Sequence, residues 1–445
     1  MASMIRGLMG TINYEDFMEK YAEAPTTFKA KSKMAEEMGN MAEKNYFRNW
    51  NHTDFMRGLD ALNPETHSMP FLTLFYAKVD KDTDSKDQLV QNLRVTFEVV
   101  LPKMEKLNTE DVRFISFVVN HSVLFMLNIA KKIPHFKQTA MKIAKLILLA
   151  VAGEEQKITP MHKMFLSTSL EVEELEEAVE LIHQDAREFV EGFEPEKPDN
   201  TKTIFFYFFL AGTVHLNLDN FSKALYLYLN ALMVPVSNTI TEYHVVMYKK
   251  YLLLNHILGT PIKQLPACLN NTLDQAVRQK CSDYEDLIKL AKSDKYGKDT
   301  AARVIKHVSK KERLFRQDDN LLLVHKVIDS CRQNMVMRVA SAFERISEAE
   351  AVNRSFCRNH QELVQFLDVL VEQGRVEYEF DEVENYFQFS IPEKENADSK
   401  LLERALKSSE VMKDAIKDYD DQCRYHQHYV SKNSIKVVSG DTPDF

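Results

Sequence analysis

Apolar residues recur at helical spacing along most of this chain. From about residue 67 onward, segments of helix length follow one another, and their apolar residues stand at positions i, i+3, i+4 and i+7. Each segment therefore carries an apolar stripe that a neighbouring helix must cover. Glycine and proline, which interrupt helices, number only 11 and 13 among 445 residues. The pattern predicts a mainly α-helical chain of long helices joined by short connections.

One predicted helix pair, between residues 208 and 231, matches a helix-turn-helix repeat. Its offsets follow the pattern W-x2-L-G-x2-Y…A-x3-F, with substitutions at most of the bulky positions. The residues expected to make this repeat packing are Phe208, Gly212, Ala224, Tyr228 and Ala231. One pair cannot bury its own face, so stacked neighbours are implied, in a right-handed, TPR-like solenoid. An ordinary antiparallel helix pair is the alternative.

The helical pattern stops at residues 373–391, QGRVEYEFDEVENYFQFSI, where apolar and polar residues alternate. Such alternation is typical of half-buried strands, and the acidic spacer between the two runs predicts a hairpin. Just before it, Ser347 and Asn359 each open a capping box, and Gly374 stands where a left-handed residue would end a helix. Three helices followed by two strands is the order of a winged helix, so the hairpin is expected to form its two-stranded wing.

These patterns predict five parts of the chain. They are an N-terminal helical or irregular segment (1–65), a helical-repeat solenoid (66–318), a winged-helix subdomain (319–395), a C-terminal assembly helix (396–424) and a flexible tail (425–445). The long C-terminal helix is predicted from a heptad-like apolar seam that an isolated helix could not bury. It either joins other chains or folds back on its own winged helix.

The wing and the C-terminal helix are the surfaces expected to carry assembly. A two-stranded wing leaves a strand edge unpaired, and such an edge is either shielded or pairs with a partner strand. Glu377, Glu379 and Asp381 are expected on the face turned away from the core. The expected interface residues are Val376, Glu377, Tyr378, Phe380, Phe387, Phe389, Leu402, Leu406, Met412, Ile416 and Tyr419.

Charge argues against nucleic acid as the partner of this winged helix. The chain has a formal net charge of −9, and residues 347–391 hold ten acidic but only three basic side chains. The helix QELVQFLDVLVEQ, which would enter a major groove, has no Arg or Lys. A basic helix at 298–316 is the one plausible phosphate-contacting surface, although such runs are more often solvated or protein-contacting faces. A winged-helix nucleic-acid adaptor is the alternative of a different class.

No catalytic motif stands out in the sequence. The loops G-x-x-x-x-G-K-[ST] and G-x-G-x-x-G do not occur, nor do H-E-x-x-H and G-x-S-x-G. His426 and His428 alternate, but two histidines without a third ligand do not make a zinc site. We expect a protein without enzymatic activity, cofactor or metal.

The sequence also predicts a soluble intracellular protein. Five cysteines are scattered without any C-x-x-C pair, which suits a reducing compartment. The first residues lack an apolar core of signal-peptide length, and the most apolar stretch is too short to span a bilayer.

The order of stacked helical pairs, winged helix and final helix resembles the PCI-domain family, whose members are subunits of the proteasome lid, the COP9 signalosome and a translation initiation factor. Within it, residues 217–236 and 248–266 closely resemble a block of the third-subunit family of the COP9 signalosome. The matching positions are Gly212, Asn220, Phe221, Ala224, Leu225, Tyr248 to Tyr251, Leu265 and Pro266. The resemblance is of a divergent member. It covers roughly 200–395, the expected PCI domain, and only the order of helices supports it over 1–190.

This resemblance implies a non-catalytic scaffold subunit of the COP9 signalosome, located in cytoplasm and nucleus. In that family, winged-helix sheets pair edge to edge and terminal helices gather in a shared bundle. The implied partners are other PCI-domain subunits and the metalloprotease-type subunits of the same complex. Cullin-RING ligases, from which the complex removes a ubiquitin-like modifier, are implied indirectly, and no membrane partner is. A subunit of the proteasome lid or of the translation factor would have the same architecture.

Overall fold

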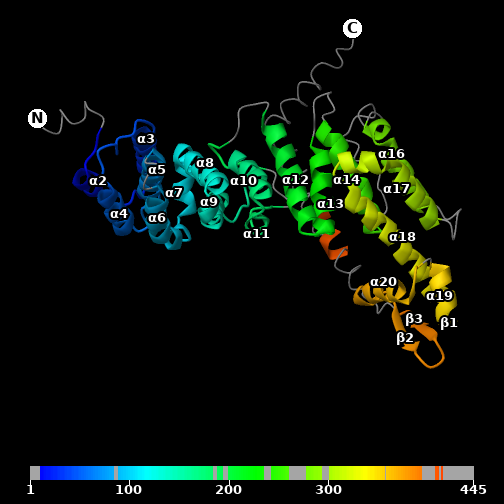
Figure 1. The fold of residues 1–445 in the computed structure, drawn as a ribbon. Helices are drawn as coiled ribbons and strands as arrows, with labels where there is room; N and C mark the ends of the chain where they lie inside the picture. Colours follow the sequence, from blue (N-terminus) through cyan, green and yellow to red (C-terminus); the bar gives the residue numbers. More distant parts are fainter. Residues whose placement is uncertain are drawn as a thin grey trace, which may run out of the picture. The chain divides into compact units, whose positions relative to one another are not determined.

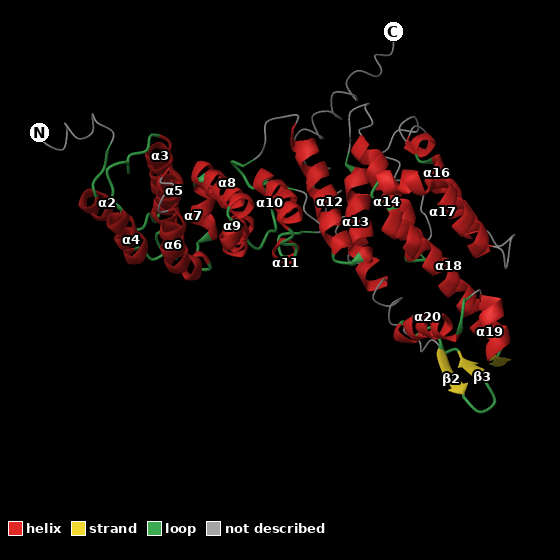
Figure 2. Cartoon of the chain, viewed as in Figure 1, coloured by secondary structure: helices red, strands yellow, loops and turns green. Residues whose placement is uncertain are grey.

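The structure is a computed structural model that describes residues 11–84, 89–183, 188–193, 199–234, 242–259, 277–292, 300–355, 357–392, 406–409 and 412–413. Most of these residues are helical, and the predicted mainly α fold with helical repeats is confirmed (Figures 1 and 2). The chain divides into two compact units, Met1–Cys331 and Arg332–Phe445. The boundary falls inside the long helix α18 (Leu321–Ala342).

The first unit begins with helices α2 (Tyr14–Lys20), α3 (Phe28–Glu43) and α4 (His52–Ala61). An aromatic cluster around Trp50 holds them together. The Trp50 ring lies edge-on to Phe17 and Phe47, with centroids 5.6 and 5.2 Å away, and its Nε1 donates to the Ile12 carbonyl at 2.8 Å. These large rings are buried in the hydrophobic core, and their burial stabilises the packing of the first helices.

The next helices stack on one another in chain order (Figure 1). They are α5 (Ser68–Asp84), α6 (Leu89–Met104), α7 (Thr109–Phe114), α8 (Ser116–Lys132), α9 (Lys137–Ala152), α10 (Pro160–Val172) and α11 (Glu176–Val179). Helix α8 packs against both α5 and α9, and α10 packs against α8 and α9. Asn108 caps the start of α7, because its side chain accepts from the Asp111 amide at 3.3 Å.

The stack continues through α12 (Asp199–Asn217), α13 (Phe221–Met233), α14 (Glu242–Ile257), α16 (Ser282–Lys292) and α17 (Thr300–Gln317) into α18. Each of α12, α13, α14 and α16 contacts the helix after it. None of the described helices of the chain is long and apolar enough to cross a membrane.

The second unit contains the end of α18, α19 (Glu348–Ser355), α20 (His360–Glu372) and a sheet of β1 (Arg345–Ser347), β2 (Glu377–Asp381) and β3 (Tyr386–Ser390). These elements form a winged helix. The sheet order is β1-β3-β2, with antiparallel pairs on both sides of β3. The predicted hairpin is present as β2 and β3, and β1 adds a third strand that the sequence did not predict. Strand β1 has only three residues, which is too short to show alternation beside a helix.

Local signals around α20 act as predicted. The Asn359 side chain accepts from the Glu362 amide at 2.9 Å, and Gly374 has a φ of +64° directly after the helix. Beneath the sheet, a separate core joins α18, α20 and the strands. Its larger members are Val336, Ile346, Leu363, Leu367, Leu370, Val376, Phe387 and Phe389.

Most of the predicted assembly helix at 396–424 lies outside the described residues. The structure describes only 406–409 and 412–413 of it, in helical conformation. Leu402, Ile416 and Tyr419 lie outside the described residues, as do His426, His428 and the rest of the predicted tail.

Candidate subunit interface

Strand β2 presents its outer edge without a strand partner among the described residues, because β3 occupies only its other side. The hydrogen bonds fix which backbone groups face outward. The Phe389 amide donates to the Glu344 carbonyl at 2.9 Å, so Phe389 is bonded on the β1 side of β3. Gln388 must then face β2, where it pairs with Glu379. Hence the backbone groups of Glu379 point into the sheet, and those of Tyr378 and Phe380 point outward.

The side chains of the hairpin divide between two faces. Glu377, Glu379 and Asp381 are exposed, whereas Tyr378 and Phe380 are half-buried. Val376, Phe387 and Phe389 are buried in the core of the second unit. These three predicted interface residues hold the sheet in place, so an interface here would use the backbone edge and the exposed side chains.

Tyr378 ties the edge strand to the helix beneath it. Its hydroxyl donates to Asp368 Oδ1 on α20 at 2.7 Å. Burial and this carboxylate raise the pKa of Tyr378 to about 12, so the hydroxyl keeps its proton and the bond at neutral pH. The orientation of β2 is therefore set by a side-chain bond as well as by the ladder to β3.

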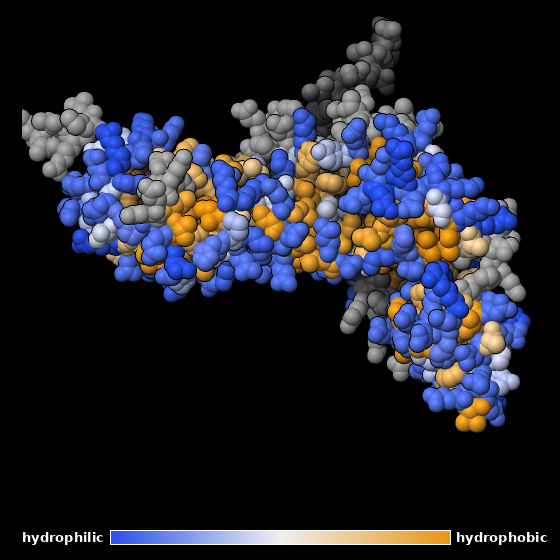
Figure 3. Space-filling model, viewed as in Figure 1, coloured by the Kyte–Doolittle hydropathy of each residue, from blue (hydrophilic) through white to orange (hydrophobic). Residues whose placement is uncertain are grey.

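The turn between β2 and β3 exposes a valine. Val383 is 91 % exposed, and Figure 3 shows hydrophobic colour at this end of the hairpin. The turn is ordered by Asp381, whose Oδ1 accepts from the amides of Val383 and Glu384 at 2.9 and 3.2 Å. A rigid turn that presents an apolar side chain to solvent is a suitable contact point for another protein.

Leu406 and Met412, which belong to the predicted apolar seam, are both exposed in the structure. Within the described part of the chain, no element buries these two side chains. These two residues remain predicted contact residues.

The predicted repeat residues come together between α12 and α13. Phe208, Ala224, Tyr228 and Ala231 are buried, and a Cβ added at Gly212 would lie 2.9 Å from two ring carbons of Tyr228. The Tyr228 hydroxyl lies 3.1 Å from Thr213 Oγ1. A glycine at this point lets the tyrosine ring fill the space between the helices.

The segment Tyr248 to Tyr251, which carries the family resemblance, anchors α14 to later helices. Tyr248 donates from its hydroxyl to Glu285 Oε1 at 3.0 Å, and Lys249 Nζ lies 2.7 Å from Asp318 Oδ2. Lys250 Nζ donates to Asn320 Oδ1 at 3.0 Å. Sequence reasoning missed these roles, although two lysines inside an apolar helix signal buried polar partners.

A second layer completes this network. Tyr284 donates from its hydroxyl to Asp318 Oδ2 at 2.8 Å and accepts from Asn320 Nδ2 at 3.1 Å. Burial lowers the pKa of Lys250, whose amine has an amide rather than a carboxylate as its direct partner. The network joins α14 and α16 to the turn between α17 and α18.

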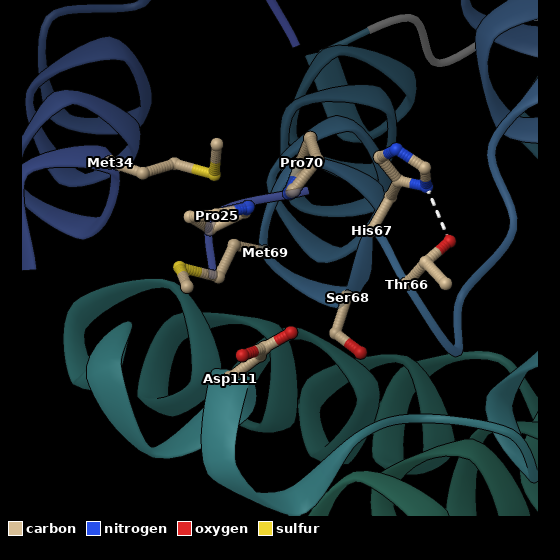
Figure 4. A pocket seen from close by; sticks show the side chains of 8 residues that line it. All are labelled: Pro25, Met34, Thr66, His67, Ser68, Met69, Pro70 and Asp111. Atoms are coloured by element: carbon tan, nitrogen blue, oxygen red, sulfur yellow. Dashed lines mark hydrogen bonds between the residues drawn. The ribbon is translucent and has the colours of Figure 1, made fainter. Parts of the chain in front are cut away.

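A small recess lies between α3, α5 and α7 (Figure 4). It is open to solvent and is lined by Pro25, Met34, Thr66, His67, Ser68, Met69, Pro70 and Asp111. Its polar groups are occupied within the fold: Thr66 Oγ1 lies 2.7 Å from His67 Nδ1, and Asp111 lies 2.8 Å from Lys31 Nζ. The side chains around the recess pack the three helices together and do not form an arrangement of reactive groups.

A contact between a cysteine and a histidine lacks the protonation states that a nucleophilic pair needs. Cys331 Sγ lies 3.6 Å from His256 Nε2, and both side chains are buried. Burial raises the pKa of the Cys331 thiol to about 12 and lowers that of His256 to about 4. A protonated thiol beside a neutral imidazole is not an activated nucleophile. Among the described residues, no group of three or more His, Cys, Asp or Glu side chains is placed to hold a metal ion.

Helical repeats that lead into a winged helix place the chain in the class of mainly α-helical repeat proteins. The family model for the N-terminal helical repeats of COP9 signalosome complex subunit 3 matches residues 29–273, which is more than half of the chain. The chain belongs to the COP9 signalosome complex subunit 3 family.

A curated relative extends this similarity. The COP9 signalosome complex subunit 3 of Drosophila melanogaster is 20 % identical over 386 residues, which cover 80 % of this chain and 80 % of the relative. The predicted resemblance to a divergent member of this family is confirmed. The family match begins at residue 29, far upstream of residue 200, where the visible motifs become dense.

Proposed function

We propose that this chain is a non-catalytic scaffold subunit of the COP9 signalosome. In this role it supports removal of the ubiquitin-like modifier from cullin-RING ligases by holding the complex together in cytoplasm and nucleus. The family match over residues 29–273 is the observation that carries the proposal. The inert state of the Cys331–His256 pair is in keeping with a role in assembly.

Two surfaces support a role in assembly. The outward amides of Tyr378 and Phe380 offer a template for a partner strand, and the acidic face beside them disfavours nucleic acid. The exposed apolar residues Leu406 and Met412 offer a helical seam for other terminal helices. The proposed partners are other PCI-domain subunits and the metalloprotease-type subunits of the same complex.

Mass spectrometry of proteins that co-purify with the tagged full-length chain tests the proposal. We expect the remaining COP9 signalosome subunits in stoichiometric amounts and accumulation of modified cullins when the chain is depleted. Recovery of proteasome-lid or translation-factor subunits in their place would overturn it.

A further inference from the structure

Helix α17 carries a line of basic side chains that pair with no acidic group among the residues that the structure describes. Lys306, Lys310 and Arg313 are all exposed, and their spacing of four and three residues puts them on one face. The opposite face is buried, with Val304, Val308 and Phe315 in the core. The three cations, named here the α17 basic stripe, extend over about 10 Å of helix.

The other cations of this helix are paired within the fold. Lys311 Nζ lies 3.2 Å from Asp283, and Arg316 lies 2.6 Å from Glu312. Asp318, at the end of the helix, is already bound by Lys249. Within the part of the chain that the structure describes, the members of the α17 basic stripe form no ion pair.

Leaving these three cations together is unfavourable for the isolated helix. Like charges three and four residues apart on one helix face repel each other and destabilise the helix. The chain as a whole has excess acid, 66 acidic against 57 basic residues, so the stripe does not follow from a basic composition. An outside anion would remove the repulsion.

We propose that the α17 basic stripe docks an acidic, Asp/Glu-rich segment of a partner protein. Charge complementarity selects an anion, and two further observations select protein over nucleic acid. Exposed Ala302 and Ile305 lie on the same helix beside the stripe, where they can contact apolar side chains. Phe315, the one Phe, Tyr or Trp of α17, is fully buried, so the helix exposes no such ring on which bases could stack.

A labelled peptide of about ten glutamates is the probe, and fluorescence anisotropy with the full-length chain is the measurement. We expect binding at low ionic strength that weakens steeply between roughly 50 and 300 mM salt. Combined Lys306→Glu, Lys310→Glu and Arg313→Glu should weaken it about tenfold or more. The charge-conserving set Lys306→Arg, Lys310→Arg and Arg313→Lys should bind like the parent chain.

A matched control separates the stripe from overall charge. Lys29→Glu, Lys44→Glu and Lys132→Glu change three exposed lysines that are scattered over α3, its end and α8. This set makes the same change in net charge and should leave peptide binding within about twofold. Circular dichroism checks that every variant keeps its helical signal.

Three results would overturn the proposal. One is equal loss of binding in the stripe and control variants, and another is no binding of the peptide at low salt. The third is a labelled single-stranded oligonucleotide that binds through the stripe more tightly than the peptide. The test uses the isolated chain, so its outcome is independent of which complex the chain joins.

Discussion

Gly212 lies on α12 where this helix packs tightly against Tyr228 of α13. A Cβ there would lie 2.9 Å from the Tyr228 ring, which is fully buried and has little room to move. The tyrosine hydroxyl is also held near Thr213, so rotation of the ring would break that contact. The glycine is therefore required by packing and not by a special backbone angle.

Gly212→Ala should lower the free energy of unfolding by about 1 to 3 kcal/mol, because overpacking against a fixed ring outweighs the gain in helix propensity. Urea unfolding followed by circular dichroism measures it. Gly39→Ala is the matched control, since nothing lies within 4 Å of an added Cβ in the middle of α3. That change should stabilise by about 0.5 to 1 kcal/mol. Equal effects of both substitutions would contradict the packing argument.

His162 is buried in the first unit beside another histidine. Its Nδ1 accepts from the Thr159 amide at 3.0 Å, and its ring centroid lies 6.1 Å from that of His183. Burial, and then the charge of His183, lower the pKa of His162 to about 3. An unfolded histidine has a pKa near 6.5, so between these values the unfolded chain binds the additional proton.

Stability should therefore fall as the pH drops below about 6.5, with His162 contributing a slope of about 1.4 kcal/mol per pH unit until its folded pKa is reached. His162→Gln should flatten this dependence between pH 7 and 5, as measured by urea unfolding at several pH values. His325→Gln, at an exposed position, serves as control and should leave the slope unchanged. If the variant kept the same slope of unfolding free energy against pH, the His162 imidazole would not be the cause of that slope.

At the scale of elements, we propose that β2 is the strand of the winged helix that pairs with a partner. One side of the strand is bonded to β3, while Tyr378 and Phe380 direct their backbone groups outward. The bond from Tyr378 to Asp368 keeps the strand in place without covering this edge.

Hydrogen–deuterium exchange at single-amide resolution can test strand pairing without any mutation. In the isolated chain, the amides of Tyr378 and Phe380 should exchange fast and that of Glu379 slowly. In the purified complex, the two outward amides should slow by about tenfold or more, since a partner strand would bond them. Glu379 is the internal control because it is bonded in both states. Fast exchange of the outward amides in the complex would rule out pairing at this edge.

Local sequence signals predicted elements well where the physics is local. The cap at Asn359, the left-handed Gly374 and the alternation in the hairpin each depend on neighbouring residues. Strand β1 could not be predicted, because three residues acquire strand structure only through pairing with β3. The partners of Lys249 and Lys250 lie about 70 residues away in the sequence, so local sequence patterns could not predict them either.

At the scale of the whole molecule, assembly is proposed to depend on the end of the chain. A chain shortened to residues 1–395 should lose its partners, because the apolar seam around Leu406 and Met412 would be missing. Its thermal melting should stay close to that of the full-length chain, since both described cores lie upstream of residue 395. Co-purification and melting by circular dichroism are the measurements.

A chain lacking only residues 425–445 provides the control for this truncation, and it should retain its partners. If the chain shortened to 1–395 still co-purified stoichiometrically with all of them, the assembly role of the terminal helix would be wrong. Loss of melting cooperativity in that variant would instead show that the segment stabilises this chain itself.

The sequence by itself determined the helical class, the order of stacked helices and winged helix, and the acidic character of the wing. These follow from periodicity, capping and charge, which act over a few residues. Only the tertiary structure showed that the Trp50 ring packs against the first helices and that β1 pairs with β3. It also showed which amides of β2 face outward. It showed further that Lys306, Lys310 and Arg313 form no ion pair with the residues that the structure describes. The physical reason is that pairing and burial join residues far apart in the chain, and their spacing in the sequence carries no record of those contacts.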